Sequence, residues 1–199
     1  MDIKDTLLKI LEWIGSSPLR LVLLIVLGFF GMIGWFVYTE KDAFMASYRA
    51  QQALPHMNGQ YQEAADFIIK QTDADLVAIF DVNPLLNTRK IVYLFVKGEG
   101  VTKKYDGYDV GLFTKNTDNN SDVISLMAGQ IPCGPYIQPQ SYIGFVYKEK
   151  GVNYMCRMSV PPDPSKFIGQ ISVGWKDKPN EDKARTVLHV ASTMLWTTP

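Results

Sequence analysis

The chain of 199 residues is poor in cysteine and histidine, and it has no excess charge of either sign. Two cysteines are too few to hold together a small disulfide-rich fold. The 20 basic and 20 acidic side chains cancel, so no basic field is present to attract nucleic acid. Repeats and polar low-complexity tracts are missing as well. We therefore expect no nucleic-acid partner and a fold that depends on a hydrophobic core.

The signature motifs of common enzymes are also missing. The sequence contains no H-E-x-x-H, no G-x-S-x-G and no Walker phosphate-binding loop. A catalytic pair would need His56 or His189 beside a thiol, from Cys133 or Cys156. We therefore expect neither an enzyme nor a bound cofactor. A membrane-bound enzyme stays as an alternative, after the two functions discussed at the end of this section.

Asp118, Asn120 and Asp122 resemble the beginning of a calcium-binding loop, in which clustered oxygen atoms hold a hard cation. That loop requires glycine at its sixth position and glutamate at its twelfth, where this chain has Val123 and Gly129. The mismatch argues against a metal site, and we interpret the segment as a solvated loop and helix cap.

One long apolar segment lies near the start of the chain. Residues 21–39 form 19 consecutive positions without a charge, and a helix of that length spans about 28 Å, close to a bilayer core of roughly 30 Å. Trp13, Arg20, Trp35 and Tyr38 flank it as membrane-interface anchors. A cleaved signal peptide would have a shorter apolar stretch, and a core helix is rarely apolar on every face. The sequence predicts a transmembrane helix.

Residues 1–20 predict a second membrane contact, on the cytoplasmic side. Their apolar residues recur at helical spacing, as in an amphipathic helix lying in the membrane interface or packing on a partner protein: Ile3, Leu7, Ile10, Leu11 and Ile14. Three basic side chains precede the span and two follow it closely, which favours a cytoplasmic N-terminus. Residues 40–199 would then lie outside.

Gly28, Gly31 and Gly34 recur at every third position within the apolar segment. On a helix they drift around one side and allow close approach of a neighbouring helix. Glycine is common in membrane spans generally, so self-association through these residues stands beside the alternative of no specific interface.

Residues 40–199 predict a domain of mixed helices and strands. We expect helices over 42–70 (interrupted near 55–59), 121–128 and 180–196, and strands over 76–82, 90–96, 142–148, 152–160 and 167–175. This order is typical of an α+β fold, with an antiparallel sheet of about five strands flanked by helices. PAS/GAF-like sensor domains share this general plan, which by itself implies no function.

Cys133 and Cys156 leave two alternatives open. Outside the cytoplasm thiols can oxidise, and a bridge closing about 23 residues would stabilise the domain by roughly 3 kcal/mol. Otherwise the two thiols are unpaired, with Cys156 on the apolar face of its strand.

Three short stretches, taken in order, resemble one known family. Residues 74–80 read ADLVAIF with Pro84 just beyond, residues 152–155 read VNYM, and residues 169–175 read GQISVGW before the last helix. With one early span, this order resembles the lysis holins of T-even-type bacteriophages. The resemblance implies a single-span protein of the host inner membrane with a cytoplasmic N-terminus and a periplasmic regulatory domain.

The resemblance also implies a function and partners. Holins of this family accumulate as homo-oligomers and form lesions at a programmed time, which release endolysin and lyse the host cell. An antiholin binds the periplasmic domain and delays lysis; no antiholin-binding residue can be transferred to this chain. The family's disulfide does not transfer either, because Cys156 is out of register and the last helix has no cysteine. The alternative is a membrane-anchored ligand-binding or adaptor domain without pore activity.

Overall fold

The computed structural model describes residues 4–5, 13, 16–53, 55–163 and 165–196, in two separately packed units, Met1–Leu54 and Pro55–Pro199. Most of the predicted amphipathic segment, residues 1–20, lies outside the described residues.

Among its described residues, the first unit contains the long helix α2 (Pro18–Ala53). Its part from Pro18 to Asp42 has 25 residues, and an 18-residue stretch within it has a mean hydropathy of 2.4 and no buried residue. That length corresponds to about 37 Å, enough to cross a bilayer core. Among the described residues there is therefore one helix of the length and composition of a membrane span, as the sequence predicts. The helix continues beyond the charged residues at 40–42 instead of ending there.

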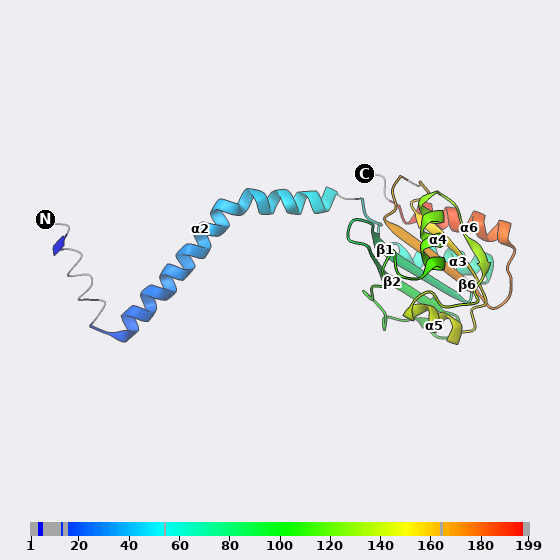
Figure 1. Cartoon of the computed structure of the whole chain (residues 1–199), viewed down its shortest axis with the longest axis horizontal. Helices are drawn as coiled ribbons and strands as arrows, with labels where there is room; N and C mark the ends of the chain where they lie inside the picture. Colours follow the sequence, from blue (N-terminus) through cyan, green and yellow to red (C-terminus); the bar gives the residue numbers. More distant parts are fainter. Residues whose placement is uncertain (1–3, 6–12, 14–15, 54, 164, 197–199) are drawn as a thin grey trace. The chain divides into compact units, whose positions relative to one another are not determined.

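The second unit is built on one antiparallel sheet with the strand order β3-β2-β1-β6-β5-β4 (Figure 1). The strands are β1 (Leu76–Asn83), β2 (Thr88–Val96), β3 (Gly100–Val101), β4 (Cys133–Pro135), β5 (Tyr154–Val160) and β6 (Gly169–Trp175). The first and sixth strands pair at the centre, where Ile79 lies opposite Ile171. Every residue of β5 and β6 is buried, because helices cover both faces of the sheet.

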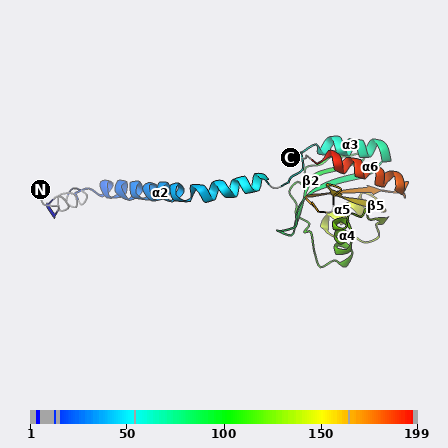
Figure 2. The same ribbon diagram turned by 90° about the horizontal axis from the view of Figure 1, so that it is seen from above.

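Four helices form two outer layers (Figure 2). They are α3 (Tyr61–Thr72), α4 (Thr117–Met127), α5 (Tyr142–Glu149) and α6 (Glu181–Met194). Helices α3 and α6 cover one face and form the larger core with side chains such as Ile68, Ile79 and Leu188. On the other face, α5 packs on Leu76, Phe80 and Leu94, whereas α4 contributes to a smaller separate cluster.

The α+β class and the flanking helices agree with the expectation from sequence. One element is different: residues 142–148, expected as a strand, form helix α5. Ile143, Val146 and Tyr147 are buried while Phe145 is 58% exposed, and this spacing of three and four residues is helical. The strands β3 and β4 are too short to produce a periodic signal, so the sheet has six strands instead of about five.

The predicted helix boundaries near Gly129 and Asn180 are confirmed. Gly129 has a φ of +73° just beyond the end of α4, a conformation that favours glycine. The side chain of Asn180 accepts a hydrogen bond from the backbone N–H of Lys183 at 3.0 Å, which caps the first turn of α6.

Gly174 in β6 packs against the buried side chain of Val152. A Cβ atom at this position would be 2.7 Å from Val152 Cγ1, closer than real contacts allow. We expect Gly174→Ala to lower the free energy of unfolding by roughly 1 to 3 kcal/mol, measured by chemical denaturation. Gly134→Ala is the control, because a Cβ there meets nothing within 4 Å. Equal stabilities of the two variants would contradict this packing.

Candidate functional site

Aromatic and cationic side chains pair at the two ends of the apolar helix. The Arg20 guanidinium lies 4.6 Å from the centre of the Trp13 ring, and its Nη1 donates a hydrogen bond to the Trp13 carbonyl oxygen at 3.2 Å. At the other end, Lys41 Nζ lies 4.5 Å from the Tyr38 ring. Trp35 is 70% exposed. Amphipathic rings and long basic side chains in such positions are suited to the headgroup layers of a bilayer.

The three glycines of the helix open an unoccupied face. A Cβ atom added at Gly28, Gly31 or Gly34 would meet nothing within 4 Å. The neighbouring apolar side chains, including Phe30 and Ile33, are exposed. This face can therefore accept either lipid or another helix.

A disulfide joins Cys133 on the edge strand β4 to Cys156 on β5. The two residues lie directly opposite each other in the antiparallel ladder, with their Cα atoms 4.1 Å apart. Closely spaced opposite residues of this kind are the non-hydrogen-bonded pairs of an antiparallel sheet. The bridge attaches the three-residue strand β4 to the buried centre of the domain, and it occupies both sulfur atoms.

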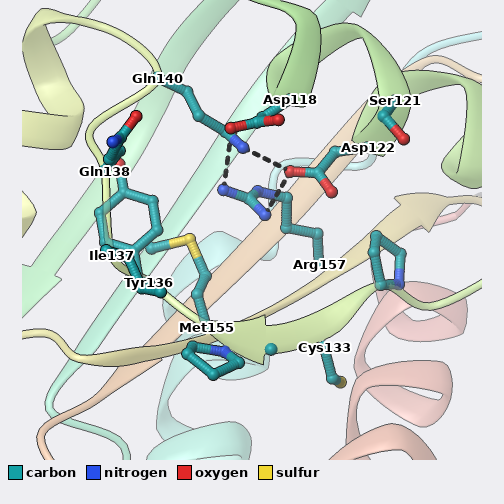
Figure 3. Close-up of a pocket in the computed structure, with 13 residues that line it drawn as sticks. Asp118, Ser121, Asp122, Cys133, Tyr136, Ile137, Gln138, Gln140, Met155 and Arg157 are labelled. Atoms are coloured by element: carbon teal, nitrogen blue, oxygen red, sulfur yellow. Dashed lines mark hydrogen bonds and ion pairs between the residues drawn. The ribbon is translucent and has the colours of Figure 1, made fainter.

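A cleft of about 480 Å³ lies beside this strand, between β4, the following loop and helix α4 (Figure 3). Asp118 and Asp122 line it from α4, and Gln138 and Gln140 line it from the loop. Arg157 reaches it from β5. The cleft therefore combines polar and apolar side chains and contains charges of both signs.

Three of these side chains form a closed ring of hydrogen bonds (Figure 3). Arg157 Nη1 lies 2.7 Å from Asp122 Oδ2, and Arg157 Nη2 donates to Gln140 Oε1 at 2.9 Å. Gln140 Nε2 in turn donates to Asp122 Oδ2 at 2.8 Å. The Arg157 and Asp122 side chains are only 11% and 22% exposed, so solvent screens this ion pair weakly. The ring holds donors and acceptors in fixed positions at the base of the cleft.

A second arginine is buried more deeply in the domain than Arg157. Arg89 is 5% exposed; its Nη1 donates to Gln170 Oε1 at 3.0 Å and its Nη2 to Asn119 Oδ1 at 2.6 Å. Burial, and then the nearby charge of Arg157, lower the pKa of Arg89 to about 10. We call the following buried polar residues the polar seam: Arg89, Asn119, Arg157, Gln170 and Ser172.

The structure also locates candidate catalytic and metal-ligating residues named from the sequence. Because both cysteines are in the disulfide, no thiol is available for the histidine–cysteine pair that the sequence left open. His189 is exposed on α6, on the opposite layer. Within the part of the chain that the structure describes, no group of three or more potential metal ligands occurs. The residues resembling a calcium loop lie on α4, where Asp122 bonds to Arg157.

Sequence reasoning missed the polar seam almost entirely. The available signal was the presence of four polar residues in two strands whose other positions are apolar residues or glycine: Arg157, Ser159, Gln170 and Ser172. Buried polar side chains in such strands need partners, and this requirement indicates a hydrogen-bonded network.

Comparisons with known proteins give similarity of architecture only. No model of a known protein family matches the sequence, and no curated protein matches it significantly. Similar solved structures include the GAF domain of a two-component sensor histidine kinase from Bacillus halodurans, with 14% identity over 67% of this chain and 88% of that chain and a TM-score of 0.49. Another is the chromophore-binding domain of a bacteriophytochrome from R. palustris, with 11% identity over 78% of this chain and 59% of that chain and a TM-score of 0.48.

Similarity at this level transfers no ligand and no activity. The structure itself shows a chain that combines one helix of membrane-spanning length with a separately packed α+β domain.

Proposed function

We propose that the protein is a membrane-anchored binding module, in which helix α2 holds an α+β domain at the bilayer surface. The observation that carries this proposal is the apolar part of α2, Pro18–Asp42, whose 25 residues are exposed. It is attached to a domain that has its own hydrophobic cores. A soluble protein would bury such a helix. The cleft, with its hydrogen-bonded ring of Arg157, Asp122 and Gln140, supplies the binding face.

A partner for this cleft should carry polar and charged groups. The ring of Arg157, Asp122 and Gln140 offers fixed donors and acceptors, while Ile137 beside it is 75% exposed and offers an apolar contact. Preordered groups bind at a smaller entropic cost than mobile ones. A protein surface or peptide of mixed character fits this combination.

A photo-crosslinking residue at Gln138 should form a covalent adduct with the partner in cells. Gln138 lines the cleft and is exposed. The control position is Val190 on α6, which is 43% exposed and lies on the opposite layer. Adducts would be read by gel shift and mass spectrometry of the full chain. Adducts at Val190 in place of Gln138, or at neither position, would contradict binding at the cleft.

A second function, the phage holin, is favoured by the ordered sequence stretches at 74–80, 152–155 and 169–175. In this proposal the protein lies in the host inner membrane with its N-terminus in the cytoplasm, and an antiholin occupies the periplasmic domain. The protein accumulates, associates laterally and forms the lesions that release endolysin. The unoccupied glycine face of α2 supports lateral association. A partner that binds the domain needs to favour the dispersed state by only a few kcal/mol to delay the transition.

Induction of the full chain in bacteria distinguishes the two functions. A holin should cause abrupt loss of membrane potential after a lag, measured with a voltage-sensitive dye. Gly31→Leu should delay that loss, because the larger side chain blocks close helix approach. Val26→Leu is the matched control, since at about 100° per residue it lies on the far side of the helix from Gly31. Harmless accumulation at equal membrane levels would contradict the holin and leave the anchored binding module.

A further inference from the structure

A small cavity lies in the polar seam beside the cleft, with which it shares Tyr136, Gln140 and Arg157. It has a volume of about 20 Å³ and is lined in part by Arg89, Tyr147, Arg157, Gln170 and Ser172. By this measure a cavity needs roughly 10 to 15 Å³ to hold one water molecule. The cavity therefore has room for one particle of about that size.

Two hydrogen-bond donors on residues that line this cavity have no partner among the described residues. They are Nε of Arg89 and the hydroxyl of Tyr147, both buried. Burial raises the pKa of Tyr147, so its hydroxyl stays protonated and remains a donor. Buried polar groups in folded proteins are almost always paired, with water or an ion where the protein offers nothing. The cavity occupant must therefore accept hydrogen bonds.

The positive charge of Arg89 beside the cavity also favours an occupant that is negatively charged. In the described part of the chain, no carboxylate forms an ion pair with the Arg89 guanidinium, which rests on two neutral amide oxygens. Asp122 is engaged by Arg157. Asp109 accepts hydrogen bonds from the backbone N–H groups of Arg89 and Gly111, at 3.0 and 2.8 Å. A buried guanidinium without an anionic partner is unfavourable.

We propose that this cavity binds a monatomic anion of the halide class, such as chloride, between Nε–H of Arg89 and O–H of Tyr147. A halide fits the volume, accepts hydrogen bonds from any direction and supplies the missing negative charge. A water molecule would satisfy the two donors but would leave the charge of Arg89 uncompensated. Halide binding makes the folded domain sensitive to the anion in its surroundings.

Thermal unfolding of the full chain in detergent tests the proposal. At constant ionic strength, replacing sodium gluconate by sodium chloride should raise the midpoint by several degrees, because the anion binds only the folded state. Tyr147→Phe removes one donor and keeps the shape of the side chain, so it should reduce this chloride response and change the midpoint in gluconate little. The matched control is Tyr93→Phe, since the Tyr93 hydroxyl is also buried and unpaired but lies in the core beneath α3 and α6.

Chloride NMR gives an independent measurement on the same samples. The protein should broaden the ³⁵Cl resonance, bromide should relieve that broadening by competition, and Tyr147→Phe should weaken it. An equal chloride response in all three proteins, together with no broadening that bromide relieves, would mean that water occupies the cavity and would overturn the proposal.

Discussion

Replacing both Leu27 and Phe30 by arginine should prevent the protein from inserting into membranes. Both side chains are exposed on the apolar part of α2, near its middle. Exchanging an apolar residue for arginine at the centre of a span disfavours insertion by about 3 to 4 kcal/mol, so the pair should disfavour it by roughly 6 to 8 kcal/mol. The measurement is the fraction of protein retained in membranes after alkaline extraction.

The control for this experiment is the pair Leu27→Ile and Phe30→Leu, which keeps the segment apolar and should remain in the membrane. Retention of the arginine variant at the level of the control would contradict the role of α2 as an anchor. It would mean that the exposed apolar helix packs on another protein.

Breaking the disulfide between Cys133 and Cys156 should also have a large effect. It should lower the stability of the α+β domain. Closing a loop with a sequence separation of 23 residues should stabilise the folded state by about 3 kcal/mol, through the lost freedom of the unfolded chain. Reduction should therefore lower the midpoint of thermal unfolding by roughly 10 °C for a domain of this size. The change is measured by circular dichroism with and without a reducing agent.

The double variant Cys133→Ala and Cys156→Ala separates the covalent bond from other effects of the reducing agent. It should already unfold at the lower temperature, and the reducing agent should leave its midpoint unchanged. A wild-type protein whose midpoint is insensitive to reduction would show that the two sulfur atoms are not bonded in solution.

The elements that sequence reasoning predicted well are those whose signal is local. The apolar helix follows from a long segment without charge, and the beginning of α6 follows from Asn180 as a cap. The central strands β1 and β2 follow from two β-rich runs separated by turn residues. In each case the chain's own spacing determines the structure, with little need for information about neighbours.

Helix α5 and the strand β4 depend on tertiary contacts instead. The segment 142–148 is rich in aromatic and β-branched residues, which favour strands, yet its buried positions have helical spacing. β4 consists of Cys133, Gly134 and Pro135 and exists because it pairs with β5. Such short elements have no period of their own to detect.

The candidate site was the least predictable part, because distant segments build it. Asp122, Gln140 and Arg157 come from a helix, a loop and a strand, and only the fold brings them together. Arg89 bonds to residues 30 and 81 positions away in the sequence. A single sequence shows that these polar residues exist, but it does not show which of them meet.

Thiol labelling of spheroplasts tests most directly the central proposal, that α2 crosses the bilayer with the domain on the outer side. Val190→Cys places a thiol on the exposed surface of α6, and Asp5→Cys places one before the helix, at an exposed residue. A maleimide too polar to cross the inner membrane should label Val190→Cys in spheroplasts at once, and Asp5→Cys only after the membrane is permeabilised. Labelling of both before permeabilisation, or of Val190→Cys only after it, would contradict the account.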